Sequence, residues 1–224
     1  MKARVILPLL FVAISAHATD PFIARITESE ELLKKGEYEK ALKIDNRLID
    51  DMVDNLGPGD EETKWFAVAL LHKAFALRGV GQDDEAVWFW HMALNIRPGL
   101  AEADMSMFGA PAEFLKQHAL APPDLPHAGS KSSNIQPPKV LKRVEPVYPY
   151  AVRWFHVTGI VILECLIDKN GDVRDVTVKK PLPAGTILYT AMQALRKWKF
   201  EPATMDGKPV EVLFNLTFNF KLTR

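Results

Sequence analysis

The feature that most constrains the fold is a sustained alternation of apolar and polar residues near the C-terminus, from Val210 to Leu222. The apolar members of this pattern are Val210, Val212, Phe214, Leu216, Phe218, Phe220 and Leu222. The residues between them are polar, except for Leu213. Because successive side chains of a strand point to opposite faces, the period of two predicts a strand with one buried face, roughly 44 Å long at about 3.4 Å per residue. Such a strand is either an ordinary member of a sheet or an edge strand left open for a partner.

The chain of 224 residues has a formal net charge of zero, yet its two halves differ in sign. Residues 19–125 hold 11 Lys and Arg against 20 Asp and Glu, whereas residues 126–224 hold 15 against 8. This asymmetry predicts two domains with different partners, or two domains that attract each other. The basic half lacks the Arg-rich, aromatic-interleaved clusters typical of nucleic-acid binders, so no nucleic-acid partner is expected.

The N-terminus has the pattern of a secretory signal peptide. Two basic residues precede an apolar run from Val5 to Ile14, which is too short for a comfortable membrane span. Ala16-His17-Ala18 is a cleavage motif that places the cut before Thr19. We therefore expect residues 1–18 to be a cleaved signal peptide and the mature protein to be exported. The alternative is an uncleaved N-terminal membrane anchor.

Residues 19–120 show helical periodicity and predict an all-α domain. The segment Gly36–Ala41, GEYEKA, is echoed by Gly81–Ala86, GQDDEA. This echo resembles the turn and second-helix start of a tetratricopeptide repeat, which implies a helix-pair fold and peptide or protein binding. Asp45 stands where that repeat expects a bulky residue. The aromatic group Trp65, Phe66, Trp88, Phe89 and Trp90 is interpreted as packing between helices, with a binding face as the alternative.

A stretch rich in proline and serine at residues 121–138 predicts a linker, and residues 139–224 form the second predicted domain. Its pattern predicts, in order, a short helix at 150–156, strands at 159–167 and 172–180 joined by a turn, a helix at 186–199 and the long final strand. The predicted fold class is therefore α+β: a helical domain followed by a three-stranded antiparallel sheet with two helices.

The sequence contains little that could perform catalysis. Cys165 is the single cysteine, so an intramolecular disulfide is impossible. No Ser/His/Asp set, metal-ligand cluster or glycine-rich phosphate loop is visible. We expect a binding protein rather than an enzyme, with no cofactor and no metal.

Several motifs of the second half occur together at a characteristic spacing. They are Tyr148-Pro149, Gly159-Ile-Val161, Asp168-x-x-Gly171 and Trp198-x-Phe200-x-Pro202-Ala203-x-x-Asp206-Gly207-Lys208-Pro209-Val210. From about residue 138 to residue 222 the chain resembles the TonB C-terminal domain family. It departs from the family in the helix after the Tyr-Pro pair, where the aromatic residues Trp154 and Phe155 replace the usual small and charged residues.

The resemblance implies binding to the periplasmic face of TonB-dependent outer-membrane transporters. In that family the last strand accepts an extended peptide, the TonB box, as an added strand. We expect the peptide to pair along Glu211 to Asn219, with the basic surface favouring acidic peptides. The expected partner-binding residues are Tyr148, Pro149, Glu211, Leu213, Asn215 and Thr217.

Full transducers of this family also have a membrane anchor that meets ExbB and ExbD, and a long proline-rich spacer. Here a cleavable leader, a helical domain and a short linker take their place. The favoured interpretation is a periplasmic protein of the TonB family linked to transmembrane transport. One alternative is an energy transducer that is anchored in the inner membrane by an uncleaved N-terminus, faces the periplasm and meets ExbB and ExbD. The other is a scaffold whose TonB-like domain is only structural and whose helical domain binds other envelope proteins.

Overall fold

The structure is a computed structural model, and it describes residues 21–118, 120, 124–128 and 134–222. The predicted signal peptide and its cleavage site lie outside the described residues, as do parts of the predicted linker. The chain divides into two compact units. The first comprises residues 1–50 and 67–119, and the second comprises residues 51–66 and 120–224. In the parts of the chain that are described, no helix is both long enough and apolar enough to cross a membrane.

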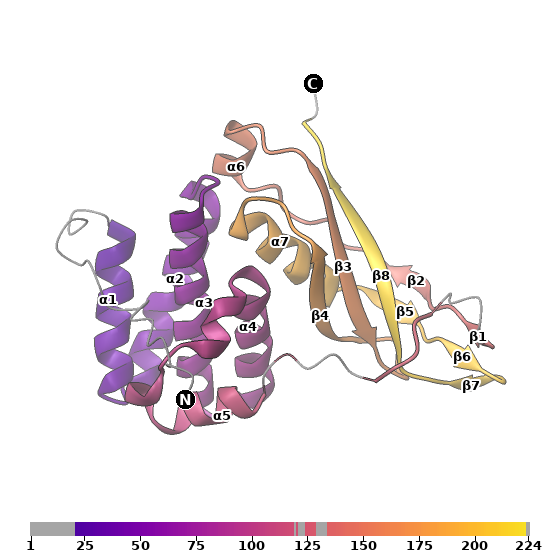
Figure 1. Cartoon of the computed structure of the whole chain (residues 1–224), viewed down its shortest axis with the longest axis horizontal. Helices are drawn as coiled ribbons and strands as arrows, with labels where there is room; N and C mark the ends of the chain where they lie inside the picture. The colour runs from indigo at the N-terminus through magenta and orange to yellow at the C-terminus, as the bar shows by residue number, and fades with distance from the viewer. Residues whose placement is uncertain (1–20, 119, 121–123, 129–133, 223–224) are drawn as a thin grey trace, which may run out of the picture. The chain divides into compact units, whose positions relative to one another are not determined.

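The first unit is built from helices, as the periodicity predicts (Figure 1). The helices are α1 (Pro21–Lys34), α2 (Tyr38–Asn55), α3 (Asp60–Gly79), α4 (Asp83–Ile96) and α5 (Ala110–Gln117), with short 3-10 helices η1 (Pro98–Glu102) and η2 (Ser106–Phe108) before α5. The end of α2 and the start of α3 belong to the second unit. Most of the aromatic group points inward: Phe66, Trp88, Phe89 and Trp90 are buried. The interpretation of these rings as packing between helices is therefore confirmed for these four.

The two echoed segments adopt the same turn. Gly36 and Gly81 both have positive φ, at 73° and 81°. The next amide in each copy donates to a carbonyl five residues back, Glu37 to Leu32 and Gln82 to Leu77, each at 2.9 Å. This is the hydrogen bond of a Schellman motif, in which glycine tolerates the left-handed conformation. The repeated sequence therefore encodes a repeated helix end.

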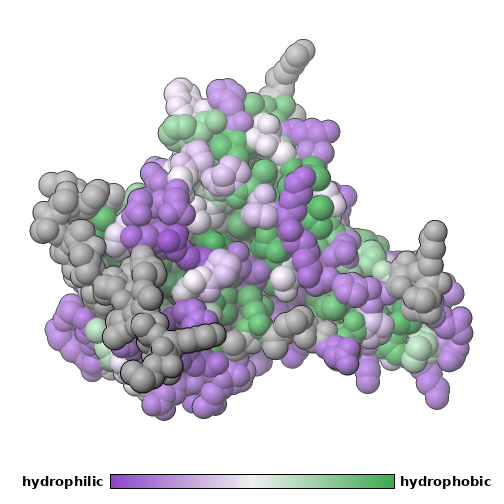
Figure 2. Space-filling view, in the orientation of Figure 1, coloured by the Kyte–Doolittle hydropathy of each residue, from purple (hydrophilic) through white to green (hydrophobic). Residues whose placement is uncertain are grey.

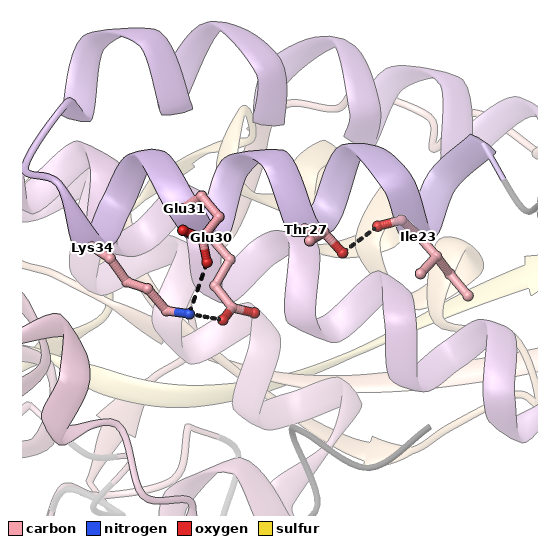
Figure 3. A network of polar contacts seen from close by, with 5 residues as sticks. All are labelled: Ile23, Thr27, Glu30, Glu31 and Lys34. Atoms are coloured by element: carbon pink, nitrogen blue, oxygen red, sulfur yellow. Dashed lines mark hydrogen bonds and ion pairs between the residues drawn. The ribbon is translucent and has the colours of Figure 1, made fainter. Parts of the chain in front are cut away.

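Helix α1 carries a small polar network on its surface (Figure 3). Lys34 Nζ lies 2.5 Å from Glu30 and 3.1 Å from Glu31, which are one helical turn earlier. Thr27 donates its hydroxyl to the carbonyl of Ile23 at 3.0 Å. Side chains three and four residues apart lie on one face of a helix, so these contacts support α1 locally.

The second unit is organised around an antiparallel sheet whose strand order is β4 (Val173–Lys180), β3 (Gly159–Ile167) and β8 (Val212–Phe220) (Figure 1). Two helices accompany it, α6 (Tyr150–Trp154) and α7 (Gly185–Arg196). The predicted α+β class and the three-stranded sheet are confirmed. The inward side chains of β3 are Val161, Leu163, Cys165 and Ile167, all fully buried.

Short strands add detail that the sequence does not predict. Strand β2 (Lys139–Lys142) pairs with β5 (Lys199–Glu201), and β1 (Ile135–Gln136), β6 (Thr204–Met205) and β7 (Lys208–Pro209) form a second small sheet. The predicted final strand is shorter than expected: β8 starts at Val212. The amide of Val210 instead donates to the carbonyl of Ala203 at 2.9 Å, which closes the β6–β7 hairpin.

The second unit also contains the end of α2 and the start of α3, the segment Asp51–Phe66. The amide of Gly185 donates to the hydroxyl of Thr63 at 3.4 Å. The ring of Phe66 meets that of Tyr189 edge-on, with centroids 5.4 Å apart. The predicted boundary near residue 120 does not anticipate this grouping, because it follows from contacts between residues far apart in the sequence. The predicted domain limits otherwise stay predictions.

Candidate peptide-binding edge

The last strand, β8, lies at one edge of the sheet and pairs with β3 on its other side. The amide and carbonyl of Leu213 both point outward, since they bond to residues outside the sheet, at 3.0 and 2.9 Å. In an antiparallel pair the backbone groups of alternate residues point to the same side. The backbone groups of Asn215, Thr217 and Asn219 therefore also point to the outer edge, where no strand among the described residues pairs with them.

The side chains at this edge are mostly polar. Asn215, Thr217 and Asn219 are exposed, whereas Phe218 and Phe220 face the core. In the space-filling view hydrophilic and hydrophobic residues are interspersed over the face shown (Figure 2). The edge thus presents amides and carbonyls at a spacing of about 6.8 Å, flanked by small polar side chains. This arrangement can bind the backbone of an extended peptide.

Leu213 corrects one expectation. Its side chain was expected on the exposed face with Asn215 and Thr217, yet it is only 7% exposed. Its amide donates to the carbonyl of Pro126, and its carbonyl accepts from the amide of Ala128, so neither group is free for an incoming peptide. Residues 126–128 of the predicted linker therefore occupy this end of the edge, with His127 paired in parallel to Leu213.

Tyr148 and Pro149 lie at the other end of β8 and have structural roles. The hydroxyl of Tyr148 donates to the carbonyl of Val157, and its ring packs edge-on against Phe220 at 5.4 Å. Pro149 is buried. Burial also raises the pKa of the Tyr148 phenol. These contacts hold the chain in place before it enters the sheet, and the expected role of the two residues in partner binding stays a prediction.

The six predicted partner-binding residues therefore do not form one cluster. Glu211 is exposed but precedes the first residue of β8. Tyr148 contacts Phe220, at the far end of a strand roughly 27 Å long at about 3.4 Å per residue. Between these ends, Asn215 and Thr217 are the two predicted residues that lie on the open part of the edge.

Sequence reasoning missed a buried carboxylate on the outer face of the sheet. Glu164 lies in the central strand opposite Asn215, and its side chain is only 8% exposed. Its oxygens lie 2.7 Å from Nζ of Lys179 and 3.4 Å from Nδ1 of His127. The signal was present in the sequence, because Glu164 is the one charged residue of the apolar strand from Gly159 to Ile167.

The motif residues of the second half hold the scaffold of this edge. Trp198 donates its indole N–H to the carbonyl of Val144 at 2.8 Å and packs edge-on against Phe218. Gly171 has a φ of 78°, and a Cβ there would lie 1.8 Å from the carbonyl oxygen of Phe200. Only glycine fits both the positive φ and this close approach.

Two observations on the described residues concern metal binding and thiol reactivity. No group of three or more His, Cys, Asp or Glu side chains that could hold a metal ion occurs among them. The thiol of Cys165 is buried, and burial raises its pKa to about 12. A thiol with this pKa is almost entirely protonated near neutral pH and is a poor nucleophile.

Comparisons with known proteins agree with the motif spacing. The family described as "Gram-negative bacterial TonB protein C-terminal" matches residues 144–222. Protein TonB of Xanthomonas campestris pv. campestris is 36% identical over 91 residues, which are 41% of this chain and 37% of that protein. Protein TonB of Vibrio cholerae is 29% identical over 106 residues, 45% of this chain and 43% of that protein.

A solved structure is also similar, the solution NMR structure of the Pseudomonas aeruginosa TonB CTD. It is 26% identical, covers 46% of this chain and 98% of its own, and has a TM-score of 0.36. The chain spans well under half the length of the curated relatives that it matches. The family match falls in the second half of the chain, where residues 144–222 fit the description of the TonB C-terminal family.

Proposed function

We propose that the second unit binds the TonB box of a TonB-dependent outer-membrane transporter by strand addition along β8. The observation that carries this proposal is the outward direction of the backbone groups of Asn215, Thr217 and Asn219 at an edge with no neighbouring strand among the described residues. A peptide that pairs there adds a fourth strand to the sheet, and its own backbone supplies the matching donors and acceptors.

The expected affinity is moderate. The three outward residues offer up to about six hydrogen bonds, each with a net value of about 0.5–1.5 kcal/mol. Ordering the peptide offsets much of this gain, so a Kd in the micromolar range, about −8 kcal/mol, requires side-chain contacts in addition to the backbone hydrogen bonds. The excess of Lys and Arg over residues 126–224 adds long-range attraction for acidic peptides, which raises the association rate at low salt.

A pair of substitutions at Thr217 tests strand addition. Thr217→Pro removes the outward N–H and should weaken binding of a synthetic TonB-box peptide at least about tenfold, with little loss of fold at an edge. Thr217→Ala keeps the N–H and should bind within about twofold of the wild type. Calorimetry measures binding, and far-UV circular dichroism checks the fold. Equal binding by both variants would show that the peptide does not pair along this edge.

We place the protein in the periplasm, where it acts in transport across the outer membrane. The helical unit is proposed as an adaptor for other envelope proteins, supported by its repeated glycine turn. The alternative of an anchored transducer that meets ExbB and ExbD depends on the fate of the N-terminus, which mass spectrometry of the native protein decides.

A further inference from the structure

The edge of β8 is already occupied at one end by the chain itself. The amide of Leu213 donates to the carbonyl of Pro126 at 3.0 Å, and the amide of Ala128 donates to the carbonyl of Leu213 at 2.9 Å. Bonds from one residue to the two neighbours of its partner are the pattern of a parallel ladder, and His127 is that partner. Residues 126–128 therefore make the same backbone contacts that an added peptide strand would make.

A side chain fixes the same segment. Nδ1 of His127 lies 3.4 Å from one carboxylate oxygen of Glu164, while Lys179 contacts the other oxygen at 2.7 Å. A carboxylate so deeply buried needs polar partners, because its isolated burial is costly. Residues 126–128 thus have three points of attachment: two backbone hydrogen bonds and the contact between His127 and Glu164.

We infer that residues 126–128 are an internal competitor for the peptide-binding edge, held in place by His127 and Glu164. The inference rests on the proposed function and adds its regulation. While the segment is bound, an incoming peptide can pair only with Asn215, Thr217 and Asn219. Displacement of the segment opens the edge as far as Leu213 and lengthens the possible ladder by one outward residue.

Two variants of the full chain weaken the attachment of residues 126–128 to β8 without a substitution in the sheet itself. Ala128→Pro removes the N–H that donates to Leu213, and Ala128→Ser is its matched control because it keeps the N–H. His127→Ala removes the contact with Glu164, and His127→Lys keeps an N–H donor there. Residue 127 is exposed and residue 128 half-buried, so neither substitution is expected to unfold the domain.

The first measurement uses the protein without peptide. Amide hydrogen exchange followed by NMR should show Leu213 protected in the wild type and in both controls, and exchanging at least about tenfold faster in A128P and H127A. Rapid exchange at Leu213 in the wild type would overturn the inference, whatever the peptide does.

The second measurement is calorimetric titration with a synthetic TonB-box peptide. A128P and H127A should bind about three- to tenfold more tightly than the wild type, as expected when each variant removes one of the three attachments of the competing segment. Unchanged affinity, with faster exchange at Leu213, would refute competition while the proposed function stands. If the peptide binds none of the proteins, the proposed function and the competition are both refuted. The exchange data then still report whether the segment is attached at Leu213.

Discussion

The buried carboxyl group of Asp45 in α2 should make the stability of the helical unit depend on pH. Asp45 is fully buried, and burial raises its pKa from 3.8 to about 7, although Ser29 and Lys73 act in the opposite direction. The folded protein therefore holds this proton more tightly than the unfolded chain. The resulting stabilisation is complete below pH 3.8 and is lost as the pH rises through 7. A change of this size corresponds to roughly 4 kcal/mol by pH 8.

His72 in α3 has the opposite effect. It is fully buried, neither ring nitrogen has a hydrogen-bond partner among the described residues, and burial lowers its pKa from 6.5 to about 3. Its contribution to stability is complete above pH 6.5 and is lost as the pH falls towards 3, at a cost of roughly 5 kcal/mol. Between about pH 4 and 6.5 the two groups offset each other, so the wild-type profile should be nearly flat there.

Asp45→Asn separates the two effects, because asparagine has nearly the same shape and does not ionise. The variant should match the wild type near pH 4 and exceed it by up to about 4 kcal/mol at pH 8. Urea unfolding followed by circular dichroism at 222 nm, from pH 4 to 8.5, measures this difference. Asp50→Asn, an exposed position in the same helix, is the control and should follow the wild type. If the free energy of unfolding depends on pH in the same way for D45N and the wild type, Asp45 is not the cause of the pH dependence.

Two further predictions test the second unit and the N-terminus. Gly171→Ala should destabilise the domain by more than about 3 kcal/mol in urea unfolding, because its Cβ would meet the carbonyl of Phe200, whereas Gly207→Ala, with a similar φ of 77° and no atom within 4 Å, should cost only about 1 kcal/mol. Equal losses of stability in the two variants would mean that the positive φ alone sets the cost and that the contact with Phe200 does not contribute. Intact-mass spectrometry of the native protein should find Thr19 as its first residue, and a species that starts at Met1 in the inner membrane would favour the anchored alternative.

Sequence reasoning succeeded where the determinant is local. The alternation after residue 210 predicted the buried and exposed faces of β8, and the Asp206-Gly207 pair predicted the turn before it, where both residues have positive φ. The spacing of the Trp198 and Phe200 motif predicted the domain. Each of these depends on a few neighbouring residues, so the pattern is visible without knowledge of distant contacts.

The contacts of the candidate site depend instead on residues far apart in the sequence. Nothing near His127 indicates that it pairs with Leu213, and nothing near Glu164 indicates which cation approaches it. Tyr148 and Pro149 were predicted as partner-binding residues from the family motif. A motif does not show whether its residues bind a partner or stabilise the fold. In the structure Tyr148 contacts Val157 and Phe220, and Pro149 is buried, while a role of either residue in binding stays a prediction.

The arrangement of β8 suggests why the linker binds at Leu213 rather than elsewhere on the edge. An exposed strand edge risks pairing with other chains, and an apolar side chain beside it increases that risk. Leu213 is the one apolar residue on the outer face of β8, and the segment 126–128 pairs with it, while Asn215, Thr217 and Asn219 beyond it are polar and exposed. The part of the edge that most favours non-specific pairing is thus occupied by the chain itself. The part that remains open is where we propose that a peptide pairs through backbone hydrogen bonds, which require an extended strand in the correct register.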